Sequence, residues 1–391
     1  MCYVHGSVNT YYFVNMNKLI GASLEQALES KLKELLGSIP WLHILEIKRT
    51  GSTSDKGFDI EATLPLPQGK AVLAIECKSE LRPSAFRALA ESKAALTRGH
   101  RPFVPVLALP SVSPRLGDLC VQQGWSWYDL AGNCHIDVAN AIYLERRGNE
   151  PLNSPPRPTA NLSTPEAGRV IRALLATENA GMRWTQRSME AHFGKLRIPI
   201  PEPSLGLVNK VVRYLRDEAF IEALPDGGFH LRDPFKLLTA WRDAYRFDRH
   251  ERRHYFTFLQ GRKLQDALAD LDLDAGGFAA YAAFSAADYQ AAHVRQPKTW
   301  LYVSDEYVKH FEDLIEAKRV ESGENLILLI PDDAGVFYLA DAGNLGDRRM
   351  ARTNPVQTYV DLSHCGGRGE EAAEAILEQT LKPKWSQYRQ L

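Results

Sequence analysis

The stretch 71-AVLAIECK-78 decides the fold of the N-terminal part of the chain. Five consecutive apolar residues, followed by Glu76-Cys77-Lys78, are typical of a central strand that is buried on both faces of a sheet. Side chains alternate along a strand with a period of two, so Glu76 and Lys78 point to the same face. Unpaired charge at the end of a buried strand is costly, and this pair therefore needs a partner or a function.

The flanking sequence predicts a mixed α/β domain around this strand. Residues 23–36 carry apolar side chains at helical spacing, with Ser23 as the N-cap and Gly37 as the stop signal. A second helix is predicted at 82–98, and further strands at 42–47, 58–64, 103–109 and 136–144. Elements in this order are typical of an α/β domain with a sheet at its core.

A third charged residue, Asp59, opens the predicted strand at 58–64. Two carboxylates such as Asp59 and Glu76 can hold a hard divalent cation such as Mg²⁺. The cation polarises a phosphodiester and acidifies a water molecule, and Lys78 stabilises the developing negative charge. These residue types therefore indicate hydrolysis of a nucleic acid. The alternative is a solvated Glu–Lys pair at a strand edge, which contributes little to stability.

The arrangement of Asp59, a connection and Glu76-Cys77-Lys78 resembles the PD-(D/E)xK pattern of restriction-endonuclease-like nucleases. The resemblance implies that Asp59, Glu76 and Lys78 are catalytic and that Asp59 and Glu76 bind Mg²⁺. It also implies a further glutamate on the preceding helix, for which we take Glu29, with Glu25 and Glu34 as alternatives. The chain has Gly57-Phe58-Asp59 in place of Pro-Asp at the first motif position.

A proline-rich stretch separates this domain from the rest of the chain. Residues 149–164 read NEPLNSPPRPTANLST and show no apolar periodicity, which is typical of an extended spacer. We predict a restriction-endonuclease-like domain at 1–150, a linker at 151–163, a winged helix-turn-helix at 164–254 and an acidic α+β domain at 255–391. The fold class is therefore multidomain, α/β and α+β.

Charge is unevenly distributed over a chain whose net charge is −1. Residues 151–264 contain 19 basic and 12 acidic side chains, a net charge of +7, whereas residues 265–391 contain 12 and 21, a net charge of −9. A basic middle region predicts contact with a polyanion, and the acidic end predicts contact with protein.

The basic middle region has the element order of a winged helix-turn-helix. Helices are predicted at 165–178, 185–193 and 204–218, and a hairpin follows around Pro225-Asp226-Gly227. In the resembled fold the third helix enters the DNA major groove and the hairpin touches the backbone. The DNA-binding residues are predicted to be Arg183, Arg187, Ser204, Asn209, Lys210, Arg213 and Arg216.

Two helix starts near the C-terminus, PVQTYVDL from Pro355 and GGRGEEAAE from Gly366, complete a second resemblance. With the central winged helix they resemble the AbiEi family, antitoxins of type IV toxin–antitoxin (abortive infection) systems, over residues 164–381. The resemblance implies a transcriptional regulator that binds double-stranded operator DNA and offsets a nucleotidyltransferase-like toxin.

Three functions follow from these patterns. The first is a DNA-binding regulator and antitoxin with a nuclease-like N-terminal domain. The second is a Mg²⁺-dependent DNA endonuclease that its winged helix targets to DNA, and the third is a protein-interaction scaffold. No apolar run approaches the ~18 residues of a membrane span, and the five cysteines include no CxxC pair, so we expect a cytoplasmic protein with reduced thiols.

Overall fold

The computed structural model describes residues 22–49, 57–67, 69–97, 103–138, 141–150, 162–196, 200–269, 278–294, 296–340 and 350–387. The chain divides into two compact units, Met1–Pro158 and Thr159–Leu391. Residues 151–161 of the predicted linker lie outside the described residues. The predicted boundary between residues 254 and 255 falls within strand β10 (Glu251–Phe256).

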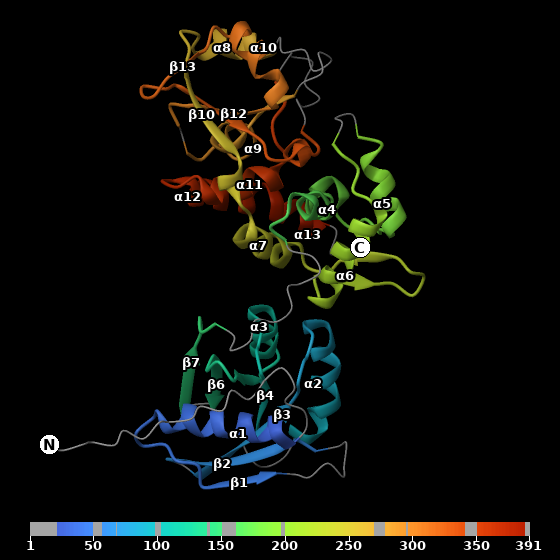
Figure 1. Ribbon diagram of the computed structural model, residues 1–391, viewed down its shortest axis with the longest axis vertical. Coiled ribbons are helices and arrows are strands. Elements are labelled where there is room, and N and C mark those ends of the chain that lie inside the picture. The colour runs from blue at the N-terminus through green and yellow to red at the C-terminus, as the bar shows by residue number, and fades with distance from the viewer. Residues whose placement is uncertain are drawn as a thin grey trace, which may run out of the picture. The chain divides into compact units, whose positions relative to one another are not determined.

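The first unit is built on a seven-stranded sheet whose strands are arranged in chain order (Figure 1). The first three strands are antiparallel, β3, β4 and β5 are parallel, and the last three are again antiparallel. The strands are β1 (Glu46–Arg49), β2 (Ile60–Leu66), β3 (Gly69–Cys77), β4 (Phe103–Leu109), β5 (Ser126–Asp129), β6 (Cys134–Val138) and β7 (Ile142–Arg146).

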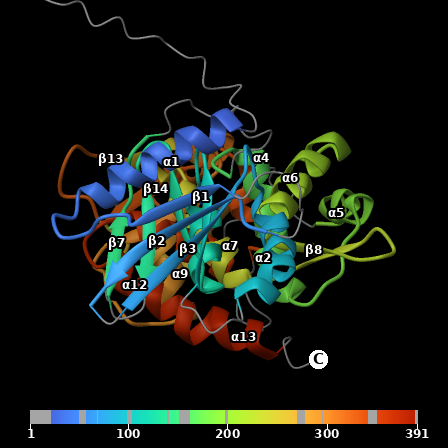
Figure 2. The same cartoon turned by 90° about the horizontal axis from the view of Figure 1, so that it is seen from below.

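Helices cover the two faces of this sheet, with α1 on one face and α2 on the other (Figure 2). Helix α3 packs on the same face as α2. The leucines of α1 (Ala22–Gly37) pack against Leu73 and Ile75 of β3. Residues of α2 (Pro83–Thr97) and α3 (Pro114–Gln122) pack against Ala74. Alternation along β3 therefore assigns each side chain of the motif to a known face.

Most predicted elements of this unit are present, although the strand predicted at 42–47 lies at Glu46–Arg49 and the second half contains three errors. The strand predicted at 136–144 is a hairpin of β6 and β7. Strand β5, which precedes this hairpin, and the helix Pro114–Gln122 were not predicted. The short, fully buried β5 carries no alternating pattern because both of its faces are covered.

The second unit begins with three helices and a two-stranded hairpin. Thr164 caps α4, Thr185 caps α5 in a capping box, and Ser204 caps α6, so the local signals are satisfied. Trp184, between α4 and α5, bridges to Phe229 of the hairpin. The elements are α4 (Pro165–Leu175), α5 (Gln186–Phe193), α6 (Leu205–Asp217), β8 (Ile221–Ala223) and β9 (Phe229–Leu231).

The rest of this unit contains a five-stranded sheet with the strand order β11-β12-β14-β10-β13. The apolar residues 336–339 are typical of a strand, but Ala334–Phe337 forms a 3₁₀ turn. The break predicted at Gly366-Gly367 is confirmed, and both glycines adopt positive φ. The elements are α7 (Pro234–Ala244), β10, α8 (Gly261–Ala269), β11 (Ala279–Tyr281), α9 (Ala283–Gln290), β12 (Thr299–Val303), α10 (Val308–Leu314), β13 (Lys318–Arg319), β14 (Leu326–Ile330), α11 (Pro355–His364), α12 (Gly369–Ile376) and α13 (Lys382–Gln387).

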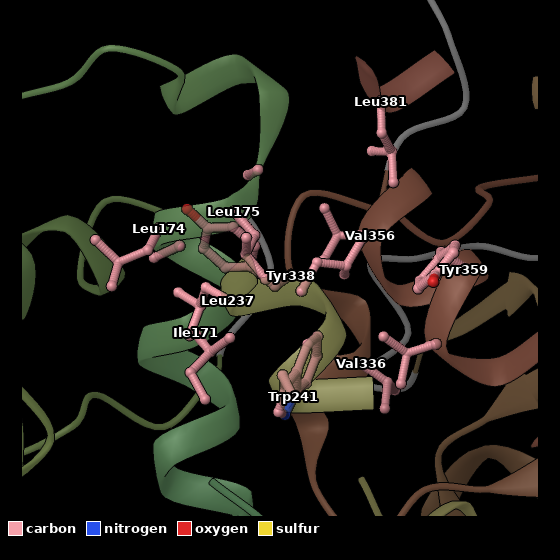
Figure 3. Packing of buried hydrophobic residues seen from close by; sticks show 14 of the residues in the cluster. Ile171, Leu174, Leu175, Leu237, Trp241, Val336, Tyr338, Val356, Tyr359 and Leu381 are labelled. Atoms are coloured by element: carbon pink, nitrogen blue, oxygen red, sulfur yellow. The ribbon is translucent and has the colours of Figure 1, made fainter. Parts of the chain in front are cut away.

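One hydrophobic core joins the helices at the start of this unit to those at its end. Ile171 of α4, Trp241 of α7, Val336 of the 3₁₀ turn and Val356 of α11 belong to the same buried cluster (Figure 3). The indole of Trp385 in α13 donates a hydrogen bond of 3.0 Å to the Leu175 carbonyl. The predicted helix–hairpin module therefore shares its core with the C-terminal elements.

Candidate functional site

The first candidate site lies where β2 begins and β3 ends. The paired residues at this end of the two strands are Ile60 and Ile75, and Asp59 and Glu76 each lie one residue beyond this pair. Asp59 donates its backbone N–H to the Ile75 carbonyl and accepts the Cys77 N–H at 2.7 Å on its carboxylate. Because Ile75 faces α1, Glu76 lies on the opposite face, which α2 covers. Asp59 is close enough to Glu76, Lys78 and Lys93 for their charges to act on its carboxyl group.

Two lysines contact the Glu76 carboxylate, which is only 3% exposed. The Lys78 ammonium lies 2.5 Å from Oε1, as the shared strand face predicts. The Lys93 ammonium, from α2, lies 2.9 Å from Oε2 and also donates to the Gly57 carbonyl. Two carboxylates and two ammonium groups thus form a compact cluster of balanced charge.

Burial and charge shift the ionisation of this cluster. Burial raises the pKa of Asp59, and the nearby Glu76 carboxylate raises it further, against the lowering effect of the Cys77 N–H. Burial opposes the charge on Lys78, but the hydrogen bond to Glu76 and the negative charges of Glu76 and Asp59 together outweigh burial and raise the pKa of Lys78. The thiol of Cys77 faces α1, and burial raises its pKa strongly, so it is a poor nucleophile.

The predicted helical glutamate, Glu29, lies elsewhere. It is on α1, the helix that covers the other face of the sheet, and it pairs with Lys33 at 2.7 Å and Arg49 at 2.6 Å. Burial opposes its ionisation, but these two partners lower the pKa of Glu29. Of the three glutamates considered, Glu25 acts electrostatically on Cys77. The structure therefore brings Asp59, Glu76 and Lys78 together and leaves Glu29 with Arg49.

Lys93 was not predicted as a site residue, although the sequence contains a signal for it. It lies seven residues after the buried Phe86, and so falls on the inward stripe of α2. A lysine on an apolar helical stripe needs a buried partner, and Glu76 is that partner. In the part of the chain that the structure describes, no group of three or more His, Cys, Asp or Glu side chains could hold a metal ion.

The second candidate site is the exposed face of α6. Val208, Val211, Val212 and Leu215 are buried, which turns Lys210, Arg213 and Arg216 to solvent. Among the described residues, none forms an ion pair with these three cations. The structure therefore places these predicted DNA-binding residues on one exposed, positively charged helix face.

The other predicted DNA-binding residues have mixed surroundings. Ser204 uses its hydroxyl to cap α6, accepting the Leu207 N–H at 3.3 Å. The Asn209 carbonyl accepts a long hydrogen bond of 3.5 Å from Gln186 of α5. Arg187 is exposed on α5, whereas Arg183 pairs with Asp226 in the hairpin loop. Arg183 therefore holds the hairpin to the segment that precedes α5.

A buried polar network lies between α4, α7 and α11, and nothing in the sequence analysis predicted it. Asp361 is fully buried and accepts hydrogen bonds from Tyr302 at 3.0 Å and Gln357 at 2.7 Å. The Nε of Arg172, on α4, donates to Gln357 at 2.7 Å. Burial raises the pKa of Asp361 to about 7, against the lowering effect of these partners.

Neighbouring His250 extends this network. Its Nδ1 accepts the Asp332 N–H at 3.1 Å, so Nε2 carries the proton and donates to the Tyr245 hydroxyl at 2.7 Å. Tyr245 in turn donates to Asp361 at 3.4 Å. Burial lowers the pKa of His250 to about 4, and the charge of Arg172 contributes to this shift. His250 and Asp361 are therefore shifted in opposite directions within one chain of hydrogen bonds.

The fold and these sites define a multidomain α/β protein with a basic helix face and a separate carboxylate–lysine cluster. Residues 230–382 match the family described as "Transcriptional regulator, AbiEi antitoxin, Type IV TA system". This part of the chain is therefore similar to that family, in agreement with the resemblance based on the helix starts at Pro355 and Gly366. The match begins at β9 and does not include the first unit, α4, α5 or α6.

Comparison with curated proteins and with solved structures found no match. Among the helices that the structure describes, none has the length and apolar character needed to cross a membrane.

Proposed function

We propose that this protein is a DNA-binding transcriptional regulator and the antitoxin of a type IV toxin–antitoxin system, acting in the cytoplasm. In this proposal α4, α5, α6 and the β8–β9 hairpin form a winged helix-turn-helix, and α6 is the recognition helix. The observation that carries the proposal is the exposed face of α6, where Lys210, Arg213 and Arg216 have solvent-facing charges. The family description of residues 230–382 supports the regulatory role.

Charge supports the same assignment. Residues 151–264 have a net charge of +7, which favours contact with phosphates. Residues 265–391 have a net charge of −9, which repels DNA and favours a basic protein surface. We propose that the acidic part contacts a nucleotidyltransferase-like toxin while α6 contacts double-stranded DNA.

The test is a DNA-binding titration of the full chain at several salt concentrations. The double variant Lys210→Ala with Arg213→Ala is expected to weaken binding and to reduce the slope of log K against log salt by about 0.9 for each lost phosphate contact. The matched control removes two exposed cations far along the chain, Arg262→Ala with Lys309→Ala. An unchanged slope in the folded α6 variant would exclude α6 from DNA binding.

A second candidate function, a Mg²⁺-dependent endonuclease, is favoured by the proximity of Asp59, Glu76 and Lys78 at the end of β3. The donor set fits Mg²⁺, which binds proteins through one or two carboxylates and completes its shell with water. Asp59 and Glu76 would hold the ion, and the ion would polarise a phosphodiester and acidify water. Lys78 would place positive charge beside the scissile phosphate.

A plasmid-nicking assay with and without Mg²⁺, run on wild type and Asp59→Ala, tests this second function. Nicking that requires both Mg²⁺ and Asp59 would support it. No nicking by wild type would remove the catalytic role and leave the first unit as a nucleic-acid or protein-binding module. If the wild-type protein neither binds DNA nor nicks it, the third function, a protein-interaction scaffold, is favoured.

A further inference from the structure

Lys93 contacts the oxygen of Glu76 that faces α2. Its ammonium lies 2.9 Å from Oε2, donates to the Gly57 carbonyl and lies 5.4 Å from the centre of the Phe58 ring. Its side chain is 8% exposed, compared with 38% for Lys78. Lys93 is thus a buried cation, held by a carboxylate, a carbonyl and an aromatic face at once.

This ammonium competes for a ligand that a metal ion would need. Glu76 shares Oε1 with Lys78 and Oε2 with Lys93, and Asp59 accepts the Cys77 N–H. A cation that binds between Asp59 and Glu76 must therefore separate Glu76 from at least one lysine. Two positive charges already balance the two carboxylates, so a third cation has no net attraction until one ammonium withdraws.

We propose that Lys93 is an internal counter-ion that holds Glu76 while the site contains no metal, and that its ammonium group weakens the binding of a divalent cation to Asp59 and Glu76. This inference rests on the endonuclease proposal and adds a regulatory residue to it. Lys93, rather than Lys78, has this role because its side chain is desolvated and anchored by the Gly57 carbonyl and the Phe58 ring. Lys78 is more exposed and can swing toward solvent while Glu76 binds a cation.

The experiment measures Mn²⁺ binding to the full chain by titration calorimetry and by the loss of free-ion Mn²⁺ paramagnetic resonance signal. The variant Lys93→Met removes the ammonium and keeps the length of the side chain. We expect its Kd for Mn²⁺ to fall at least tenfold below that of wild type. The matched control is Arg87→Met on the same helix, which removes a cation from an exposed pair with Glu91 and is expected to leave the Kd unchanged.

Two further variants keep the result decisive. Lys93→Gln retains a donor toward Glu76 and replaces Lys93→Met if that variant does not fold. Asp59→Ala in the Lys93→Met background should abolish binding, which assigns the ion to this cluster. A Kd that is equal or higher in the folded Lys93 variant overturns the proposal.

The outcomes also separate this inference from the endonuclease proposal. If wild type binds Mn²⁺ through Asp59 and the Lys93 variant binds no tighter, the metal site stands and the counter-ion role is wrong. If neither wild type nor the Lys93 variants bind Mn²⁺, both proposals are wrong.

Discussion

The pKa values of His250 and Asp361 are shifted in opposite directions, and each shift makes the free energy of unfolding depend on pH. In the wild-type protein the two dependences oppose one another. Folding raises the pKa of Asp361 from 3.8 to about 7 and lowers that of His250 from 6.5 to about 4. Between pH 4 and 6.5, folded Asp361 keeps a proton that the unfolded chain releases, so its contribution to stability falls as pH rises. Over the same interval, unfolded His250 binds a proton that the folded state excludes, so its contribution rises with pH.

The magnitudes are similar, which is why the two effects cancel. One pKa unit corresponds to about 1.4 kcal/mol. A shift of about three units for Asp361 and of between two and three for His250 gives about 4 and about 3 kcal/mol over their full ranges. Between pH 4.5 and 6.5, each group alone would change the free energy of unfolding by about 2–3 kcal/mol, with opposite sign.

Single variants should reveal each dependence. Asp361→Asn removes the proton uptake but keeps an oxygen for Tyr302 and Gln357, so stability should rise between pH 4.5 and 6.5 because His250 titrates alone. His250→Gln keeps a donor toward Tyr245, and stability should fall over the same interval. The double variant should be nearly flat, like wild type. The measurement is urea unfolding of the full chain followed by tryptophan fluorescence at four pH values.

The reasoning fails if Asp361→Asn has the same pH profile as wild type. In that case Asp361 would ionise in the folded state near its ordinary pKa, and burial would not be the main influence on that pKa. A control variant, Asp243→Asn, removes an exposed carboxylate that pairs with Arg242 on the surface of α7 and should not alter the profile by more than a few tenths of a kcal/mol.

Two further predictions concern a close backbone contact and a buried hydrogen-bond acceptor. Gly369→Ala would place a Cβ against the Leu362 carbonyl oxygen, so the junction of α11 and α12 must shift. We expect the free energy of unfolding, measured by chemical denaturation, to fall by about 1–3 kcal/mol; an unchanged denaturation midpoint would contradict this close contact. Asp129→Ala would leave the buried N–H groups of Val112 and Asn133 without their acceptor, and we expect the free energy of unfolding to fall by at least about 2 kcal/mol. The control is Asp118→Ala, which removes an exposed carboxylate. Equal losses of stability in the two variants would refute the buried-acceptor role.

The fold of the first unit was predictable where local pattern and burial agree. The apolar stripe of α1 is buried against the sheet along its length, and most residues of β3 are buried by helices on both faces. Both elements are present where they were predicted. Strand β5 was missed because all four of its residues are buried, which removes the alternation that marks a strand. The hairpin of β6 and β7 was read as one strand because the sequence between the two strands, residues 139–141, contains no glycine or proline.

The candidate sites were predictable to the extent that their residues are neighbours in sequence. Glu76 and Lys78 share a strand face through local geometry alone, and their contact follows from spacing. Lys93 reaches Glu76 only through the packing of α2 on the sheet. Asp361 is linked to Arg172 only through Gln357, which lies 185 residues after Arg172 in the sequence. Contacts of this kind depend on tertiary packing, which a single sequence does not specify.

The family segment and the predicted DNA-reading helices cannot be independent folding units. Arg169 of α4 forms a largely buried ion pair with Asp333, and Arg172 donates to Gln357 of α11, so both cations are satisfied by residues within 230–382. Removing α4 would leave Asp333 without its counter-ion in a largely buried position, which is costly. It would also expose the apolar surface that Ile171 covers. A change in the C-terminal elements that moves α11 must therefore act on α4, the first helix of the module proposed to bind DNA.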